Sequence, residues 1–369
     1  MSVPEVALPD RPHQAAEASS PAAAVGSRLL HIARGAAPLL GSALLLAATM
    51  LVSLSLGKYK VSLREIALYF WQRWVGGNAI AADRMALLNG VLMEIRLPRI
   101  LAAALVGSAL SASGASFQAM FVNPLVSPSL LGVLAGASFG AALGIVYLKT
   151  WFAVEVATFI GGLAAVMLAV GIASIYRNNS TIMLVLGGII SGALFTSLLS
   201  LVKYLSDPFN QLPTIVSWLM GSLTLTDRSM LGKVSIPILG GLLLLLLLSR
   251  HLNVLSMGDE EAHALGVNVR AVRLLVIFAA TVVSALTVVI AGTIGWVGLI
   301  VPHFTRMITG PDNTRLIPAS MLIGAAYLIV VDSIARLAFT FELPIGIVTA
   351  LVGIPCFAVV LRNARKGWN

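Results

Sequence analysis

The chain has 369 residues, of which 58% are hydrophobic and only 11% are charged, and its mean hydropathy is +0.96. An ordinary soluble domain carries about 25% charged residues, so this composition excludes a soluble enzyme and indicates a multi-pass membrane protein. The apolar runs are continuous rather than alternating, which predicts membrane-spanning helices and not a barrel. The formal net charge of +9 falls mainly in loops, where membrane topology and lipid headgroups account for it without a nucleic-acid partner.

Three regions are expected along the chain. Residues 1–35 are rich in Ala, Pro and Ser and predict a disordered cytoplasmic tail. Residues 36–361 hold the membrane spans, and residues 362–369 form a short basic tail in the cytoplasm. The single cysteine, Cys356, excludes an internal disulfide and a multi-cysteine metal site.

Ten spans are predicted within residues 36–361. The eighth is too short to cross a bilayer by itself and contains Pro302, which predicts a broken or tilted helix packed inside the protein. The predicted spans are residues 38–57, 98–121, 129–148, 152–175, 181–204, 232–249, 272–292, 296–308, 316–338 and 345–361.

Basic residues predict the orientation of these spans. Arg28 and Arg34 precede the first span, and the tail at 362–369 is basic, so the positive-inside rule places both termini in the cytoplasm. Residues 58–97 are then external, although they carry six basic and three acidic side chains. This violation of the rule predicts that the external positive charge has a use outside the membrane.

Few ionisable residues lie deep within the spans. Asp332 is the clearest, and Arg336 follows it at the i, i+4 spacing of a helical ion pair. Proton-coupled carriers keep several such groups at mid-membrane, so the scarcity counts against a proton-driven pump. The chain has no phosphate-binding loop, zinc-protease motif or nucleophile elbow, and neither catalytic residues nor metal ligands are expected.

A charged island, Gly258–Val269, separates two very apolar runs. A helix beginning near Asp259 would place Ala262 and Leu265 on one face, and Gly266 would end it. A polar turn alone would suffice to reverse the chain, so this acidic helix predicts a surface that another protein grips.

Several motifs, in a fixed order over roughly residues 90–360, resemble the permease subunit of type II ABC importers, the FecCD/BtuC-like family. The resemblance implies an all-α membrane protein of about ten transmembrane helices with the BtuC-like bundle. The motifs are Arg96–Arg99, Gly114 with Gln118, Asn123–Pro128, Trp218–Ser222, Gly258–Val269, Gly295–His303, Gly310–Asp312, Asp332 with Arg336, and Glu342–Ala350.

The resemblance also implies roles for individual residues. External arginines would dock a periplasmic binding protein, an acidic helix at about residues 256–270 would couple to the ATPase, and two loops would close the cytoplasmic side. The implied docking residues are Arg96, Arg99 and Arg336. The implied coupling residues are Asp259, Glu260, Glu261, Ala262, Leu265 and Gly266. The implied gate residues are Asn123, Leu125, Ser180 and Thr181.

The assembly that the resemblance implies is a permease homodimer in the bacterial inner membrane. Two ATP-binding subunits would hold ATP and Mg, and a periplasmic substrate-binding protein would deliver the substrate. An iron chelate, siderophore or haem, is the expected substrate, with cobalamin or an oxyanion such as molybdate as the alternative. From the residues alone, an ion-coupled secondary transporter and a membrane-embedded enzyme remain alternatives of other classes.

Overall fold

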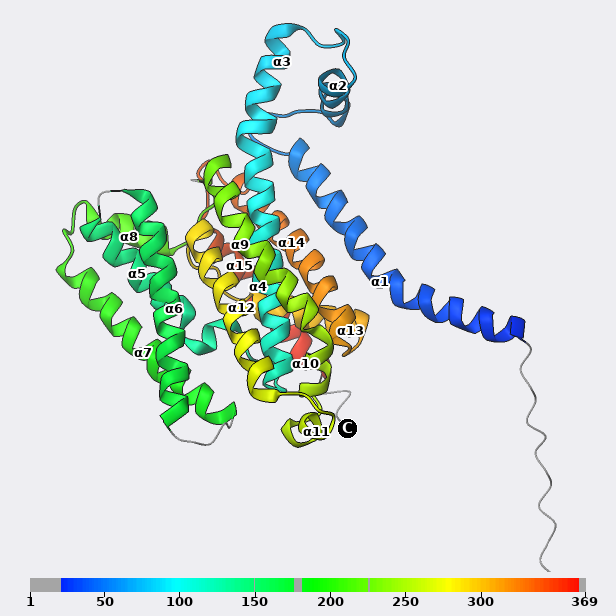
Figure 1. Cartoon of the computed structure of the whole chain (residues 1–369). Coiled ribbons are helices and arrows are strands. Elements are labelled where there is room, and N and C mark those ends of the chain that lie inside the picture. The colour runs from blue at the N-terminus through cyan, green and yellow to red at the C-terminus, as the bar shows by residue number, and fades with distance from the viewer. Residues whose placement is uncertain (1–20, 149, 176–180, 225, 365–369) are drawn as a thin grey trace, which may run out of the picture. The chain divides into compact units, whose positions relative to one another are not determined.

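A computed structural model describes residues 21–148, 150–175, 181–224 and 226–364, and every regular element in these ranges is helical (Figure 1). The chain divides into two units, Met1–Ala37 and Pro38–Asn369. The first helix, α1 (Pro21–Ser55), begins inside the region expected to be a disordered tail. Pro at the first helical position and the alanines that follow favour this earlier start.

The second unit has a helix at each of the ten predicted spans. Seven of the described helical stretches are long and apolar enough to cross a membrane, whereas α5 and α13 have only 15 and 13 residues. Besides α1, the helices are α4 (Leu97–Met120), α5 (Val133–Tyr147), α6 (Trp151–Ile175), α7 (Thr181–Leu205), α9 (Arg228–Leu247), α12 (Val269–Ala291), α13 (Val297–Thr309), α14 (Asn313–Leu337) and α15 (Ile345–Ala364).

Short helices cover the ends of this unit. Figure 1 shows α2 (Leu63–Trp74) and α3 (Ala82–Asn89) at one end, called here the α3 end, and α11 (Asp259–Ala264) at the opposite α11 end. A π-helical turn, η1 (Gly90–Arg96), joins α3 directly to α4. The remaining short helices are η2 (Pro128–Leu131), α8 (Gln211–Leu219) and α10 (Ser249–Leu255).

Helix α4 forms the centre of the unit and packs against α9, α12, α13 and α14. Glycines permit this close approach, because a Cβ at Gly107 would overlap the backbone of Gly324, and a Cβ at Gly114 would overlap the carbonyl of Gly298. The dense glycines of the sequence therefore serve the compact packing of helices.

Helix α13 confirms the predicted short helix, but it is one continuous helix of 13 residues and is not broken at Pro302. It is separated from α12 by a non-helical stretch in which Gly292 and Trp296 both have positive φ, 68° and 69°. It packs against α4, α14 and α15, and contains Pro302. Pro302, which has no backbone N–H to donate, and Gly298, four positions earlier, are both buried, so the hydrogen bond that proline removes lies inside the protein.

Candidate functional site

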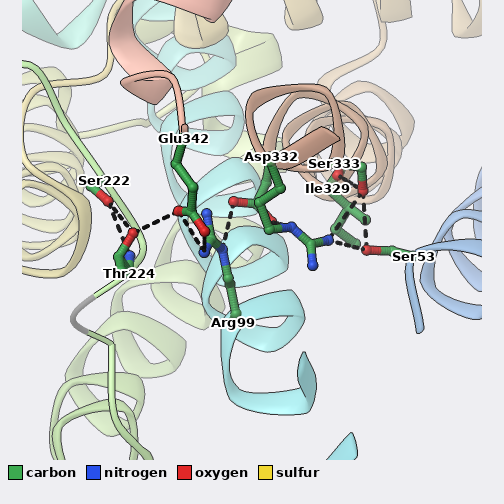
Figure 2. Close-up of polar contacts among 9 residues, drawn as sticks. Ser53, Arg99, Ser222, Thr224, Ile329, Asp332, Ser333 and Glu342 are labelled. Atoms are coloured by element: carbon green, nitrogen blue, oxygen red, sulfur yellow. Dashed lines mark hydrogen bonds and ion pairs between the residues drawn. The ribbon is translucent and has the colours of Figure 1, made fainter. Parts of the chain in front are cut away.

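A buried charge cluster lies at the α3 end of the bundle. Asp332 on α14 is 1% exposed, and its Oδ1 accepts from Nε of Arg99, on the first turn of α4, at 2.9 Å. Its Oδ2 lies 3.0 Å from Nε of Arg336, one helical turn later, so the predicted i, i+4 ion pair is confirmed. Figure 2 shows Arg99 and Asp332 meeting between the two helices. One buried carboxylate therefore bridges two guanidinium groups.

The cluster extends into two loops through Glu342, which precedes α15. Its Oε2 lies 3.0 Å from Nη1 of Arg99 and accepts from the hydroxyl of Thr224 at 2.9 Å (Figure 2). Partial burial raises the pKa of Glu342, but the Arg99 charge and the Thr224 hydrogen bond outweigh it and hold the pKa below its usual range. Sequence reasoning placed Glu342 in a motif but assigned it no role, because its partners are distant along the chain.

Arg96 lies apart from the cluster. Its guanidinium donates to the carbonyl oxygens of Leu54 and Ser55, the last two residues of α1, and of Tyr59 just after it. It is buried, as are Arg99 and Arg336. These three arginines were expected to face an external partner, but in the structure their side chains are buried within the chain. An arginine beside an apolar span needs local partners, and this chain supplies them itself.

At the α11 end, the expected helix begins at Asp259, and Gly266, the residue predicted to end it, follows the C-cap residue Leu265. Gly266 has φ +79°, and its N–H donates to the carbonyl of His263 at 2.9 Å. The N–H of Val267 returns to the carbonyl of Ala262 at 3.0 Å. These two bonds form a Schellman cap, which needs a left-handed residue at the glycine position.

The prediction that Ala262 and Leu265 share an exposed face is wrong. Ala262 is fully buried, whereas Leu265 is 62% exposed. Leu265 is the C-cap, where the helix has already ended, and the chain folds back over Ala262 through the Val267 hydrogen bond. Asp259, Glu260, Glu261 and the C-cap Leu265 are exposed and are called here the α11 face; His263, Ala264 and Gly266 are exposed beside them.

The expected gate residues lie in two segments. The side-chain oxygen of Asn123 accepts from the N–H of Leu125 at 2.9 Å, which leaves Leu125 exposed in the loop after α4. That loop leads into η2, which packs against α7. Thr181 is the first residue of α7, and Ser180 lies outside the described residues.

Sequence reasoning also missed a link between α10 and α14. Asp312 caps α14 and accepts from the amide of Asn253 at 2.7 Å, while the Asn253 oxygen accepts from the N–H of Asn313 at 2.7 Å.

Among the described residues, no group of three or more His, Cys, Asp or Glu could hold a metal ion.

Comparison with known proteins identifies the kind of molecule that carries these features. Residues 45–363 match the model of the FecCD transport family. The chain belongs to this family. It is therefore the permease subunit of a type II ABC importer, and is not itself an enzyme.

The relatives differ in what they carry. The molybdate import permease MolB of Haemophilus influenzae is 39% identical over 89% of this chain and 96% of its own length. The hemin transport permease HmuU of Yersinia pestis is 37% identical over 86% of this chain and 94% of its own. A solved inward-facing conformation of a metal-chelate type ABC transporter is 38% identical, with a TM-score of 0.78, and covers 88% of this chain and 98% of that one.

Proposed function

We propose that this chain is one protomer of a homodimeric permease in a bacterial inner membrane, with both termini in the cytoplasm. Two ATPase subunits, which hold ATP and Mg, bind at the α11 end, and a periplasmic binding protein docks at the α3 end. Transport proceeds by alternating access, and the segments at Asn123–Leu125 and Ser180–Thr181 close the cytoplasmic side.

The exposed α11 face is the observation that carries this proposal. It presents Asp259, Glu260 and Glu261 together with Leu265, at the end of the unit opposite the α3 end (Figure 1). A chain without a phosphate-binding loop of its own needs a separate ATPase to bind it. An exposed apolar side chain surrounded by charged residues is typical of the centre of a protein interface.

Replacing Leu265 with Asp tests the proposal. The change should abolish co-purification of the ATPase, because it places an unpaired charge in the centre of the interface. Leu63→Asp, at a similarly exposed leucine of α2, is the matched control and should leave the ATPase bound. Stoichiometric ATPase on Leu265→Asp would contradict the assignment of α11.

For the substrate, we propose an iron chelate, the class that the sequence resemblance favours and that the hemin relative supports. Molybdate is the second candidate, favoured by the 39% identity to a molybdate permease over 96% of that relative. Cells that lack their own uptake systems, supplied with this permease and its partners, should gain iron from a ferric chelate. Accumulation of molybdenum without iron, measured by elemental mass spectrometry, would select the second candidate.

A further inference from the structure

Arg273 joins the α11 face to the interior of the bundle. It lies on the first turns of α12, is 8% exposed, and its Nη2 is 2.9 Å from Oδ1 and 3.1 Å from Oδ2 of Asp259, the first residue of α11. The Asp259 side chain is half-exposed. One end of this ion pair therefore belongs to the proposed ATPase-binding surface, and the other is held inside the helix bundle.

The same nitrogen also reaches a third helix. Nη2 of Arg273 lies 3.5 Å from the hydroxyl of Thr181, the first residue of α7. At that distance the contact is weak, whereas the contact with Asp259 is a charge-assisted bond of normal length. The guanidinium is thus held firmly by α11 and loosely by α7.

A cavity lies beside the contacts that Arg273 makes with Asp259 and Thr181, and it leaves room for the Arg273 side chain to move. It has a volume of about 170 Å³ and lies among α6, α7, α11 and α12, with Ser174, Thr181, Asp259, His263 and Arg273 in its lining. Space for several water molecules beside a buried guanidinium means that the side chain can shift without displacing packed core residues.

We propose that Arg273 is the positioning residue that transmits movement of α11 to the start of α7, and so to the segment that the proposed function assigns to the cytoplasmic gate. When the ATPase displaces α11, Asp259 draws the Arg273 guanidinium with it, and the hydrogen bond to Thr181 tightens or breaks. The inference rests on the proposed function, because it requires α11 to be the surface on which the ATPase acts.

The test measures substrate transported per ATP hydrolysed in the reconstituted permease–ATPase complex. Arg273→Gln should retain the ATPase and its turnover, yet lower this ratio about tenfold, a change of about 1.4 kcal/mol in coupling. Arg273→Lys keeps the charge beside Asp259 but reaches less far, and should recover part of the ratio. Thr181→Val removes only the hydroxyl and should lower the ratio about twofold, as expected for one long, weak hydrogen bond.

The outcomes separate the possible failures. If Arg273 only stabilises α11, Arg273→Gln would reduce ATPase binding, ATP turnover and uptake in the same proportion, and the inference would be overturned. If Arg273→Gln fails to fold, the other two variants still test the inference. An unchanged ratio of substrate transported to ATP hydrolysed in both Thr181→Val and Asp259→Asn would overturn it. If Leu265→Asp still binds the ATPase, the proposed function has failed instead.

Discussion

Replacing Asp332 with Asn should be among the most destabilising single changes in this chain. Asp332 is 1% exposed and lies 2.9 Å from Arg99 and 3.0 Å from Arg336. Removing one partner of a buried ion pair costs about 3–5 kcal/mol, because it leaves an uncompensated charge in the interior. Arg99 keeps Glu342 after the change, so the cost falls mainly on Arg336, whose other partners among the described residues are the hydroxyls of Ser53 and Ser333.

That asymmetry defines a second variant. Asp332→Asn with Arg336→Met removes the stranded charge together with its partner, and replacing a buried pair by apolar groups is often near neutral. We expect the double variant to be more stable than Asp332→Asn alone. The assay is unfolding of the purified permease in mixed micelles under denaturant, and Glu342→Gln, which alters a half-exposed group, is the control and should cost less than about 1 kcal/mol.

A different result would refute this account of the cluster. If the double variant were as unstable as the sum of its two single changes, Asp332 and Arg336 would be acting independently. If Asp332→Asn cost no more than Glu342→Gln, burial of the carboxylate would not govern the stability of the α3 end.

Two further predictions follow from packing and from charge. Gly114→Ala should cost about 1–3 kcal/mol or more in the same unfolding assay, because its Cβ would overlap the carbonyl of Gly298, whereas Gly240→Ala, with nothing nearby, should be neutral or stabilising. Folding lowers the pKa of Glu342. The ionised carboxylate therefore makes its full contribution to the free energy of unfolding at pH 7, and this contribution is lost as the pH falls below about 4.3. The stability difference between wild type and Glu342→Gln should therefore disappear in acid, and a difference that grew in acid would contradict the ion pair.

Local patterns in the sequence predicted much of this structure. Hydropathy located all ten helices, the length of the eighth apolar run predicted the short buried α13, and helical spacing predicted the pair of Asp332 with Arg336. Gly266 marked the end of α11 because only a residue that tolerates positive φ forms that cap easily. Each of these features depends on residues within one or two helical turns.

The predictions that were missed or wrong concern contacts between segments that are distant along the chain. Arg99 is 233 positions from Asp332, and no periodicity specifies that α4 and α14 bring them together. Ala262 lies on the expected side of α11, but whether that side faces solvent is decided by how the following chain folds back. Side-chain partners across the bundle require the topology of the whole unit, which a single sequence does not display.

Burial of the arginines changes where the docking charge should be sought. Reversing Arg99 or Arg336 would place a carboxylate beside Asp332 in the interior and damage the fold, so a loss of docking would be uninformative. Lys60 and Arg64, by contrast, are exposed near the start of α2 at the α3 end. Exposed charges of this kind accelerate encounter with an acidic partner and are screened by salt.

We therefore expect Lys60→Glu with Arg64→Glu to slow association with the cognate binding protein about tenfold at low ionic strength, with no loss of permease stability. The difference should shrink as salt approaches about 1 M, where the screening length is about 3 Å. Arg250→Glu, an exposed reversal on α10 towards the α11 end, is the control and should bind at the wild-type rate. If the double reversal also associates at the wild-type rate while the protein remains folded, the positive charge of α2 does not guide docking. The excess of basic residues between positions 58 and 97 would then need a different explanation.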